Sequence, residues 1–99
     1  MDALVALLRR HEIPLTIAVY PWPEQLRYDT AESIQVTFWR QWASRRGVRF
    51  VDLFAPLFRD ADRASTIRRF YIDGDVHFNS DGAKVIAREF LAQWSGPRT

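Results

Sequence analysis

Two short apolar segments separated by a helical stretch constrain the fold of this chain more than any other feature. Residues 15–20 (Leu-Thr-Ile-Ala-Val-Tyr) predict a strand that is apolar on both faces, and residues 48–53 predict a second strand. The stretch between them carries apolar residues at helical spacing and ends at Gly47. A strand-helix-strand connection of this length gives a parallel pair with a right-handed crossover. The sequence therefore predicts an α/β fold.

The remaining segments predict helices and loops rather than strands. Residues 3–11 predict a helix, residues 21–23 (Pro-Trp-Pro) open a polar loop, and residues 54–70 predict short helical turns. The chain has 99 residues, and none of these segments supplies a further strand. A two-stranded parallel sheet is not stable alone, because parallel strands need covered faces and further neighbours. We therefore expect the sheet to continue in residues outside this chain or to be completed by a second copy.

Two longer helices are predicted. The first runs from about residue 29 to 45, and Asp29 with Glu32 resembles a capping box at its start. Its predicted inner face consists of Ala31, Ile34, Phe38 and Trp42. The last helix is predicted to be capped by Asn79 and ended by residues 96–97 (Gly-Pro). Its apolar residues at helical spacing are Ala83, Ile86, Ala87, Phe90 and Trp94.

The composition excludes several classes of protein. Apolar residues make up 47% and charged residues 26% of the chain, as in an ordinary globular domain. The absence of cysteine excludes disulfides and thiolate metal sites. The net charge of +2 is small and scattered, so no nucleic-acid partner is predicted. No segment approaches the roughly 18 apolar residues that span a bilayer, and the N-terminus does not match a signal peptide. The cellular location stays open, since a longer parent could be exported or membrane-anchored.

Residues 71–82 (Tyr-Ile-Asp-Gly-Asp-Val-His-Phe-Asn-Ser-Asp-Gly) carry the strongest chemical signal. Asp73 and Asp75 stand four and two positions before His77, in a loop that enters the last helix. A carboxylate beside an imidazole is half of a Ser-His-Asp relay, in which the acid orients the ring and the ring acts as general base. Such a loop is expected near the carboxyl ends of parallel strands, where ligands bind. The alternative is a surface turn whose Asp and His serve local hydrogen bonds.

The sequence contains two other candidate sites. Trp22 follows the first strand directly and could line an acyl or sugar pocket, or pack on its own helix. The acids between Asp73 and Asp81 are spaced like the start of a calcium loop, but Phe78 stands where that loop needs glycine. Lys84 also stands where that loop ends in glutamate. We therefore predict no metal site and no cofactor.

The Asp-His segment and its flanks resemble a known family. Residues 75–79 (Asp-Val-His-Phe-Asn), followed by Gly82 and an amphipathic helix, resemble the last conserved block of SGNH/GDSL-type hydrolases. The upstream order is similar too: a helix, an apolar strand ending in residues 20–26, a Trp-rich helix and residues 47–53. The resemblance covers residues 1–99, but only the C-terminal part of that family's domain. It implies a three-layer, flavodoxin-like α/β fold, here with about two strands and three main helices.

The resemblance implies ester hydrolysis or O-acyl transfer by the parent domain, on an acyl ester that can be a carbohydrate ester. His77 would deprotonate a serine, and Asp75 would hold the imidazole ring. The commonest form of the family places the acid three residues before the histidine, a position that is Gly74 here. Asp75 fits the spacing of alginate-acetyltransferase-like members, and Asp73 is the reserve candidate.

The family's nucleophile and oxyanion donors lie in blocks that this chain does not contain. The nucleophile belongs to a Gly-Asp-Ser block near the start of that domain, and the donors are a Gly and an Asn from two middle blocks. The serines of this chain stand in other contexts: Ser33, Ser44, Ser65, Ser80 and Ser95. Acyl transfer then lacks its covalent step and its main electrostatic stabilisation, so the chain alone is expected to be inactive. The alternative function is a non-catalytic interaction module that forms a homodimer through an open sheet edge.

Overall fold

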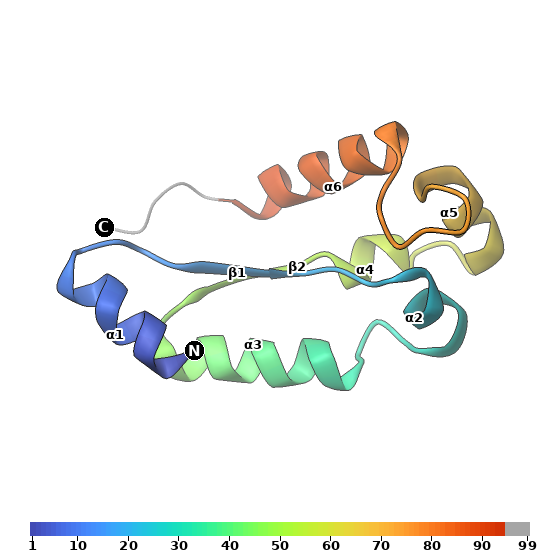
Figure 1. Cartoon of the computed structure of the whole chain (residues 1–99). Coiled ribbons are helices and arrows are strands. Elements are labelled where there is room, and N and C mark those ends of the chain that lie inside the picture. The colour runs from blue at the N-terminus through green and yellow to red at the C-terminus, as the bar shows by residue number, and fades with distance from the viewer. Residues whose placement is uncertain (95–99) are drawn as a thin grey trace.

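The computed structural model describes residues 1–94 and shows a mixed α/β chain (Figure 1). Its elements are α1 (Asp2–Arg10), β1 (Thr16–Val19), α2 (Pro23–Tyr28), α3 (Ile34–Arg46), β2 (Arg49–Asp52), α4 (Phe54–Leu57), α5 (Arg63–Phe70) and α6 (Ser80–Gln93). The two strands form a parallel pair, in which Thr16 lies opposite Arg49. At the other end of the pair, Val19 lies opposite Asp52. The predicted α/β fold with a parallel pair is therefore confirmed.

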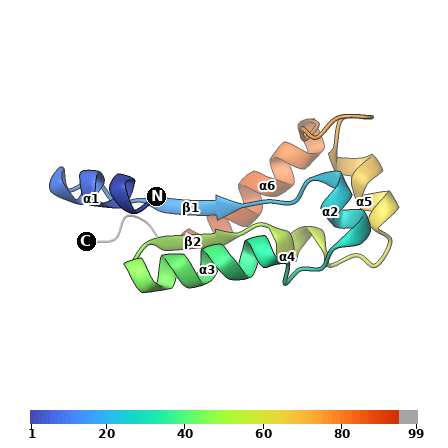
Figure 2. The same cartoon turned by 60° about the horizontal axis from the view of Figure 1, so that its bottom comes forward.

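Helices cover both faces of the two strands. Figure 1 shows α3 below the strands and α6 above them, and Figure 2 shows α1 lying beyond the start of β1. The α1 helix packs on the end of α3, where Val5 meets Trp42 and Ala43. The carboxylate of Asp2 accepts hydrogen bonds from Trp42 Nε1 at 3.2 Å and from Arg46 Nε at 2.9 Å. Within the described residues, none of the helices combines the length and apolar character needed to cross a membrane.

The main core lies at the carboxyl ends of the strands, where α2, α4 and the chain after α5 meet. Its buried residues are Val19, Leu26, Val36, Phe54, Leu57, Phe58 and Tyr71. Phe54 is fully buried, and its ring stacks on that of Phe58 with the centroids 6.0 Å apart. The core therefore supports the end of the molecule at which the Asp-His loop lies.

The predicted start of the long central helix is wrong. A separate helix, α2, occupies part of the predicted polar loop, and Asp29 lies just past its end. Pro23 begins α2, a position at which proline is favoured because its missing N–H costs nothing there. The α3 helix then begins at Ile34, with the Ser33 hydroxyl accepting a hydrogen bond from Val36 N at 3.2 Å.

The later start of α3 also changes the face that it buries. Ile34 and Phe38, predicted on the inner face, are 87% and 53% exposed. Val36 and Ala43 are fully buried instead, and Trp42 is buried as predicted. The predicted face was wrong because α3 carries apolar residues around most of its circumference, so that helical spacing alone fits more than one stripe.

Two predicted helix ends are confirmed, whereas the capping box predicted at Asp29 and Glu32 does not begin α3. Gly47 ends α3 in the left-handed conformation with φ of 65°. Asn79 caps α6, since its side chain accepts a hydrogen bond from Gly82 N at 2.8 Å. Of the apolar residues expected on α6, Ile86 packs against the core, whereas Ala83 and Ala87 are exposed. The predicted stop at residues 96–97 lies outside the described residues.

The outer edge of β2 is closed by a side chain of α6. The backbone N–H of Asp52 donates to Gln93 Oε1 at 3.0 Å, and Gln93 Nε2 donates to the Asp52 carbonyl at 2.7 Å. One amide group therefore satisfies both backbone groups that Asp52 presents on the side away from β1. A further strand cannot pair at this position without displacing Gln93.

The opposite edge of the sheet, formed by β1, is open among the described residues. Val19 faces β2, because its carbonyl accepts a hydrogen bond from Leu53 N at 2.9 Å. Residues alternate in the side to which their backbone groups point, so Ala18 directs its N–H and C=O away from β2. Ala18 is also exposed. The outward backbone groups of Ala18 on β1 are therefore open to a further strand, whereas those of Asp52 on β2 are already bonded to Gln93.

Candidate active site

The Asp-His loop, residues 71–79, is fixed to the carboxyl end of β1 by two aromatic residues. Tyr71 is only 3% exposed, and its hydroxyl donates a hydrogen bond of 2.5 Å to the Pro21 carbonyl. Burial raises the pKa of Tyr71, with a smaller effect from Tyr20, so this hydroxyl stays protonated and able to donate. The Phe78 ring lies 5.5 Å from the Tyr20 ring. The loop therefore lies at the sheet end where open α/β folds bind ligands.

The C-terminal flank of the loop is fixed by Asn79. Besides capping α6, its side-chain amide donates to the carbonyl of Arg69 at 2.9 Å, near the end of α5. Gly82 packs so closely on α5 that a Cβ atom there would overlap the Phe70 carbonyl oxygen. That oxygen already accepts a hydrogen bond from Asn79 N at 3.0 Å. The start of α6 and the end of α5 thus form one tightly packed junction beside the loop.

A turn at Gly74 explains the position of the acid. Asp75 N donates to the Ile72 carbonyl at 2.9 Å, which closes a turn over residues 72–75. The third residue of this turn is Gly74, with a left-handed φ of 71°. Glycine is the residue that this conformation favours, so an aspartate at this position would be strained. The position three residues before the histidine is therefore used by the turn, and the acid follows it.

The structure brings Asp75 and His77 into contact. Asp75 Oδ1 lies 2.7 Å from His77 Nδ1 and also accepts hydrogen bonds from the backbone N–H groups of Val76 and His77. The His77 ring, followed by these two N–H groups, holds the pKa of Asp75 below its usual value. An ionised carboxylate only accepts, so Nδ1 donates to it, and in the neutral form of the ring Nε2 then keeps a free lone pair. This is the tautomer that a general base of the Ser-His-Asp type uses.

Asp73, the reserve acid, is exposed and makes no hydrogen bond to His77 among the contacts of residues 1–94. It lines a cavity of about 590 Å³ between α2, α5 and the loop, together with Asp75 and Arg68. Neither His77 nor Trp22 lines this cavity. The structure thus brings one of the two predicted acids to the imidazole and leaves the other beside an open cavity.

Trp22 lies at the start of α2 and is 54% exposed. Its backbone N–H donates to Gln25 Oε1 at 2.9 Å, which fixes the first turn of α2. No hydrogen bond joins the Trp22 side chain to the Asp-His pair within residues 1–94, and a role in substrate binding stays a prediction. The groups that sequence reasoning missed are Tyr71 and Pro21, whose hydrogen bond joins residues 50 positions apart. No local pattern in the sequence signals that contact.

The imidazole is open to solvent. The side chains of His77 and Asp75 are 76% and 44% exposed, and within residues 1–94 the ring is hydrogen bonded only to Asp75. Ser33 is buried as the cap of α3, while Ser44, Ser65 and Ser80 lie on helices; Ser95 lies outside the described residues. Over the same part of the chain, no three His, Cys, Asp or Glu side chains are grouped to hold a metal ion.

Comparisons with protein-family models, with curated proteins and with solved structures find no match for this chain. The geometry alone therefore defines its class. It is a mixed α/β chain with one parallel pair of strands and an exposed carboxylate-imidazole pair at the carboxyl end of β1.

Acid is expected to release the contacts of Asp75. The pKa of Asp75 lies below its ordinary value of 3.8 in the folded loop. The stabilisation from its ionised form is therefore complete above that value and is lost as the pH falls through the lowered pKa. In ¹H-¹⁵N spectra recorded from about pH 6 to about pH 2, the amide signals of Val76 and His77 should shift together at the low end. The variant Asp75→Asn should lack this shift, and a shared midpoint above 3.8 would contradict the geometry.

Proposed function

We propose that this chain is the C-terminal part of an SGNH-type serine ester hydrolase or O-acyltransferase domain and supplies the Asp-His half of its triad. The observation that carries the proposal is the 2.7 Å contact between Asp75 Oδ1 and His77 Nδ1. This contact leaves Nε2 facing away from the acid, at the end of the parallel pair where substrates of α/β enzymes bind. The sequence resemblance of residues 71–82 and their flanks supplies the reaction class.

In this mechanism each residue has one role. His77 Nε2 takes the proton of a serine hydroxyl as the serine attacks an acyl ester, and later gives that proton to the leaving alcohol. Asp75 holds the ring and stabilises its cation. The alcohol can belong to a carbohydrate, and Trp22 is then a candidate wall of the sugar or acyl pocket. Residues beyond this chain supply the serine and the oxyanion donors, so the chain alone is expected to be inactive.

Three observations support an incomplete domain. The edge of β1 can still accept a strand, and the imidazole that needs a covered site is 76% exposed. The radius of gyration is 14.9 Å, against about 13 Å for a compact chain of this length. An elongated chain with a bare sheet edge and a bare imidazole is what remains when the neighbouring strands of a larger domain are missing.

The coding sequence upstream of Met1 provides the test. We expect an in-frame Gly-Asp-Ser block there, and p-nitrophenyl acetate turnover by the protein that includes it. The 99-residue chain alone should show negligible turnover. Turnover by the purified chain that His77→Ala abolishes would show that no further segment is needed. An upstream region without such a block would contradict the proposal.

A second candidate function is an interaction module that forms a homodimer through β1. The observation that favours it is the difference between the two sheet edges, since Gln93 closes β2 while β1 accepts pairing. Light scattering of the purified chain should then give a compact dimer. Ala18→Pro should abolish the dimer, because it removes an outward N–H of β1 while the bonds to β2 remain. A monomer that is unchanged by Ala18→Pro would exclude this function.

A further inference from the structure

Arg49, the first residue of β2, is a buried cation whose Nη1 atom has no acceptor in the described part of the chain. It is 7% exposed, and within residues 1–94 its Nη1 atom is buried and has no hydrogen-bond acceptor. Its guanidinium lies 4.1 Å from the centre of the Trp94 ring. The ring face attracts the positive charge but accepts no directed hydrogen bond comparable to those of a carboxylate.

Some other arginines of residues 1–94 are paired with acids, whereas Arg63 Nη1 is also buried without an acceptor. Arg40 contacts Glu32 at 2.9 Å, and Arg59 contacts Glu89 at 2.9 Å, both at more exposed positions. Arg49 is the more deeply buried side chain, yet it faces no carboxylate in the described part of the chain. Arginine keeps its charge in proteins, and a buried charge requires a hydrogen-bonded counter-charge. Within residues 1–94, the environment of Arg49 therefore lacks an anion.

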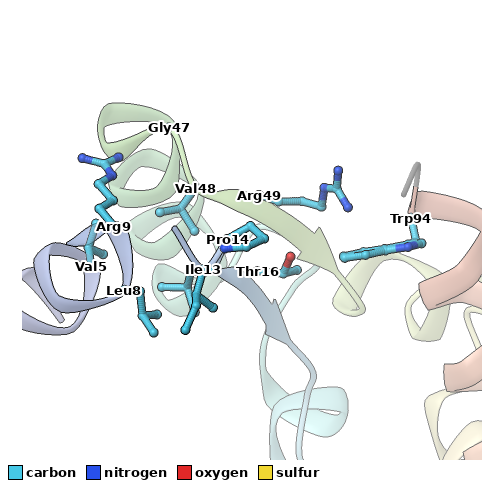
Figure 3. A pocket seen from close by; sticks show the side chains of 11 residues that line it. Val5, Leu8, Arg9, Ile13, Pro14, Thr16, Gly47, Val48, Arg49 and Trp94 are labelled. Carbon is cyan, nitrogen blue, oxygen red and sulfur yellow. The ribbon is translucent and has the colours of Figure 1, made fainter. Parts of the chain in front are cut away.

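A pocket at this end of the sheet has Arg49 among the residues that line it. Its volume is about 120 Å³, and it lies between α1, the start of β1, the start of β2 and the end of α6 (Figure 3). Leu8, Ile13 and Val48 supply apolar walls, and Arg9, Thr16 and Arg49 supply polar groups. Figure 3 shows the side chains of Thr16 and Arg49 extending from neighbouring strands toward the Trp94 ring. The lining of the pocket thus combines apolar side chains with a hydroxyl and the guanidinium of Arg49.

We propose that this pocket binds a small carboxylic acid with a short apolar chain. The carboxylate lies against the Arg49 guanidinium, whose planar N–H fork fits two carboxylate oxygens, and it accepts a further hydrogen bond from the Thr16 hydroxyl. The apolar chain lies against Ile13 and Val48. A dry cavity of about 150 Å³ holds a benzene molecule, so the 120 Å³ here matches a chain of about four carbons.

This site is separate from the Asp-His pair. Thr16 and Arg49 lie at the amino ends of β1 and β2, whereas His77 lies in the loop fixed at the carboxyl end of β1. Binding at Arg49 therefore needs no serine, no oxyanion donor and no second copy of the chain. Binding at Arg49 is therefore independent of the proposed function and is tested separately.

Sodium butyrate is the probe for this pocket, with n-butanol as its neutral counterpart and sodium phosphate as a general anion. Titration of the full chain should give saturable NMR shifts of the Arg49 Nε–H and Trp94 indole signals, with a Kd of about 1–10 mM for butyrate. Butanol and phosphate should bind at least about tenfold more weakly, because butanol has no carboxylate and phosphate has no apolar chain. Equal binding of phosphate, or no saturation by butyrate at about 100 mM, would overturn the proposal.

Two variants separate the charge of Arg49 from its planar fork. Arg49→Met fills similar space and should weaken butyrate binding at least about tenfold, and Arg49→Lys should weaken it less. Arg59→Met, which removes an exposed cation, should bind butyrate like the natural chain. Circular dichroism checks that each variant is folded, and Arg49→Lys keeps the test decisive if Arg49→Met unfolds. Unchanged affinity in folded Arg49→Met or Arg49→Lys would show that Arg49 does not hold the carboxylate.

Discussion

In the proposed serine ester hydrolase, replacing His77 with alanine is expected to lower kcat about a million-fold, and Asp75→Asn about ten-thousand-fold. The losses differ because His77 moves the proton itself, whereas Asp75 fixes the ring tautomer through the 2.7 Å contact with Nδ1. KM should change little, since neither side chain is proposed to bind the acyl chain. Hydrolysis of p-nitrophenyl acetate by the proposed longer protein measures both effects.

Asp73→Asn is the matched control for this series. It removes a carboxylate from the same loop, but Asp73 makes no contact with the His77 ring within the described structure. We expect kcat to stay within about threefold of the natural value. A loss at Asp73 larger than the loss at Asp75 would transfer the role of the triad acid to Asp73. Equal activity of His77→Ala and the natural protein would reject the Asp-His relay altogether.

Gly82→Ala is expected to lower the free energy of unfolding by about 2 kcal/mol or more. The added Cβ overlaps the Phe70 carbonyl oxygen, a backbone atom that cannot swing away and that also binds Asn79 N. Alanine gains up to about 1 kcal/mol over glycine in helix propensity, which is smaller than the roughly 3 kcal/mol of severe overpacking. The start of α6 must then move off α5, taking the anchor of the Asp-His loop with it. Urea unfolding followed by circular dichroism measures the loss.

Ala87→Gly provides the comparison within the same helix. Ala87 is exposed on α6, so glycine there should cost only about 1 kcal/mol of helix propensity. The two substitutions are opposite in kind, yet both should destabilise the protein, and Gly82→Ala should do so more strongly. A stabilising Gly82→Ala, which helix propensity alone predicts, would contradict the close contact between α5 and α6.

Features governed by local chemistry could be predicted from the sequence. The strands followed from apolar runs of the right length, and Gly47 and Asn79 marked helix ends because their roles depend only on adjacent backbone groups. Asp75 was predicted as the partner of His77 because the two lie within one short loop. In each case the determining contacts join residues fewer than five positions apart.

Features governed by tertiary contacts could not be predicted. The buried face of α3 depends on where the helix begins and on what lies beneath it, so Ile34 and Phe38 were placed on the wrong side. The loop at His77 is held by the bond from Tyr71 to Pro21 and by the contact of Phe78 with a ring after β1. Contacts across such separations leave no periodic or spacing signal in a single sequence.

The side chain of Gln93 makes the two edges of the sheet unequal for association of this protein. Because its amide occupies the outward groups of Asp52 on β2, a strand added beside β1 displaces no existing bond there, whereas one added at Asp52 must displace Gln93. Two copies joined by a two-fold axis at β1 would form a four-stranded sheet that carries a Gln93 stop on both outer strands. Such an assembly is finite and does not propagate into a fibre. If strands of the same domain take that place instead, β2 remains terminal, and β1 becomes an interior strand with the imidazole loop at its end.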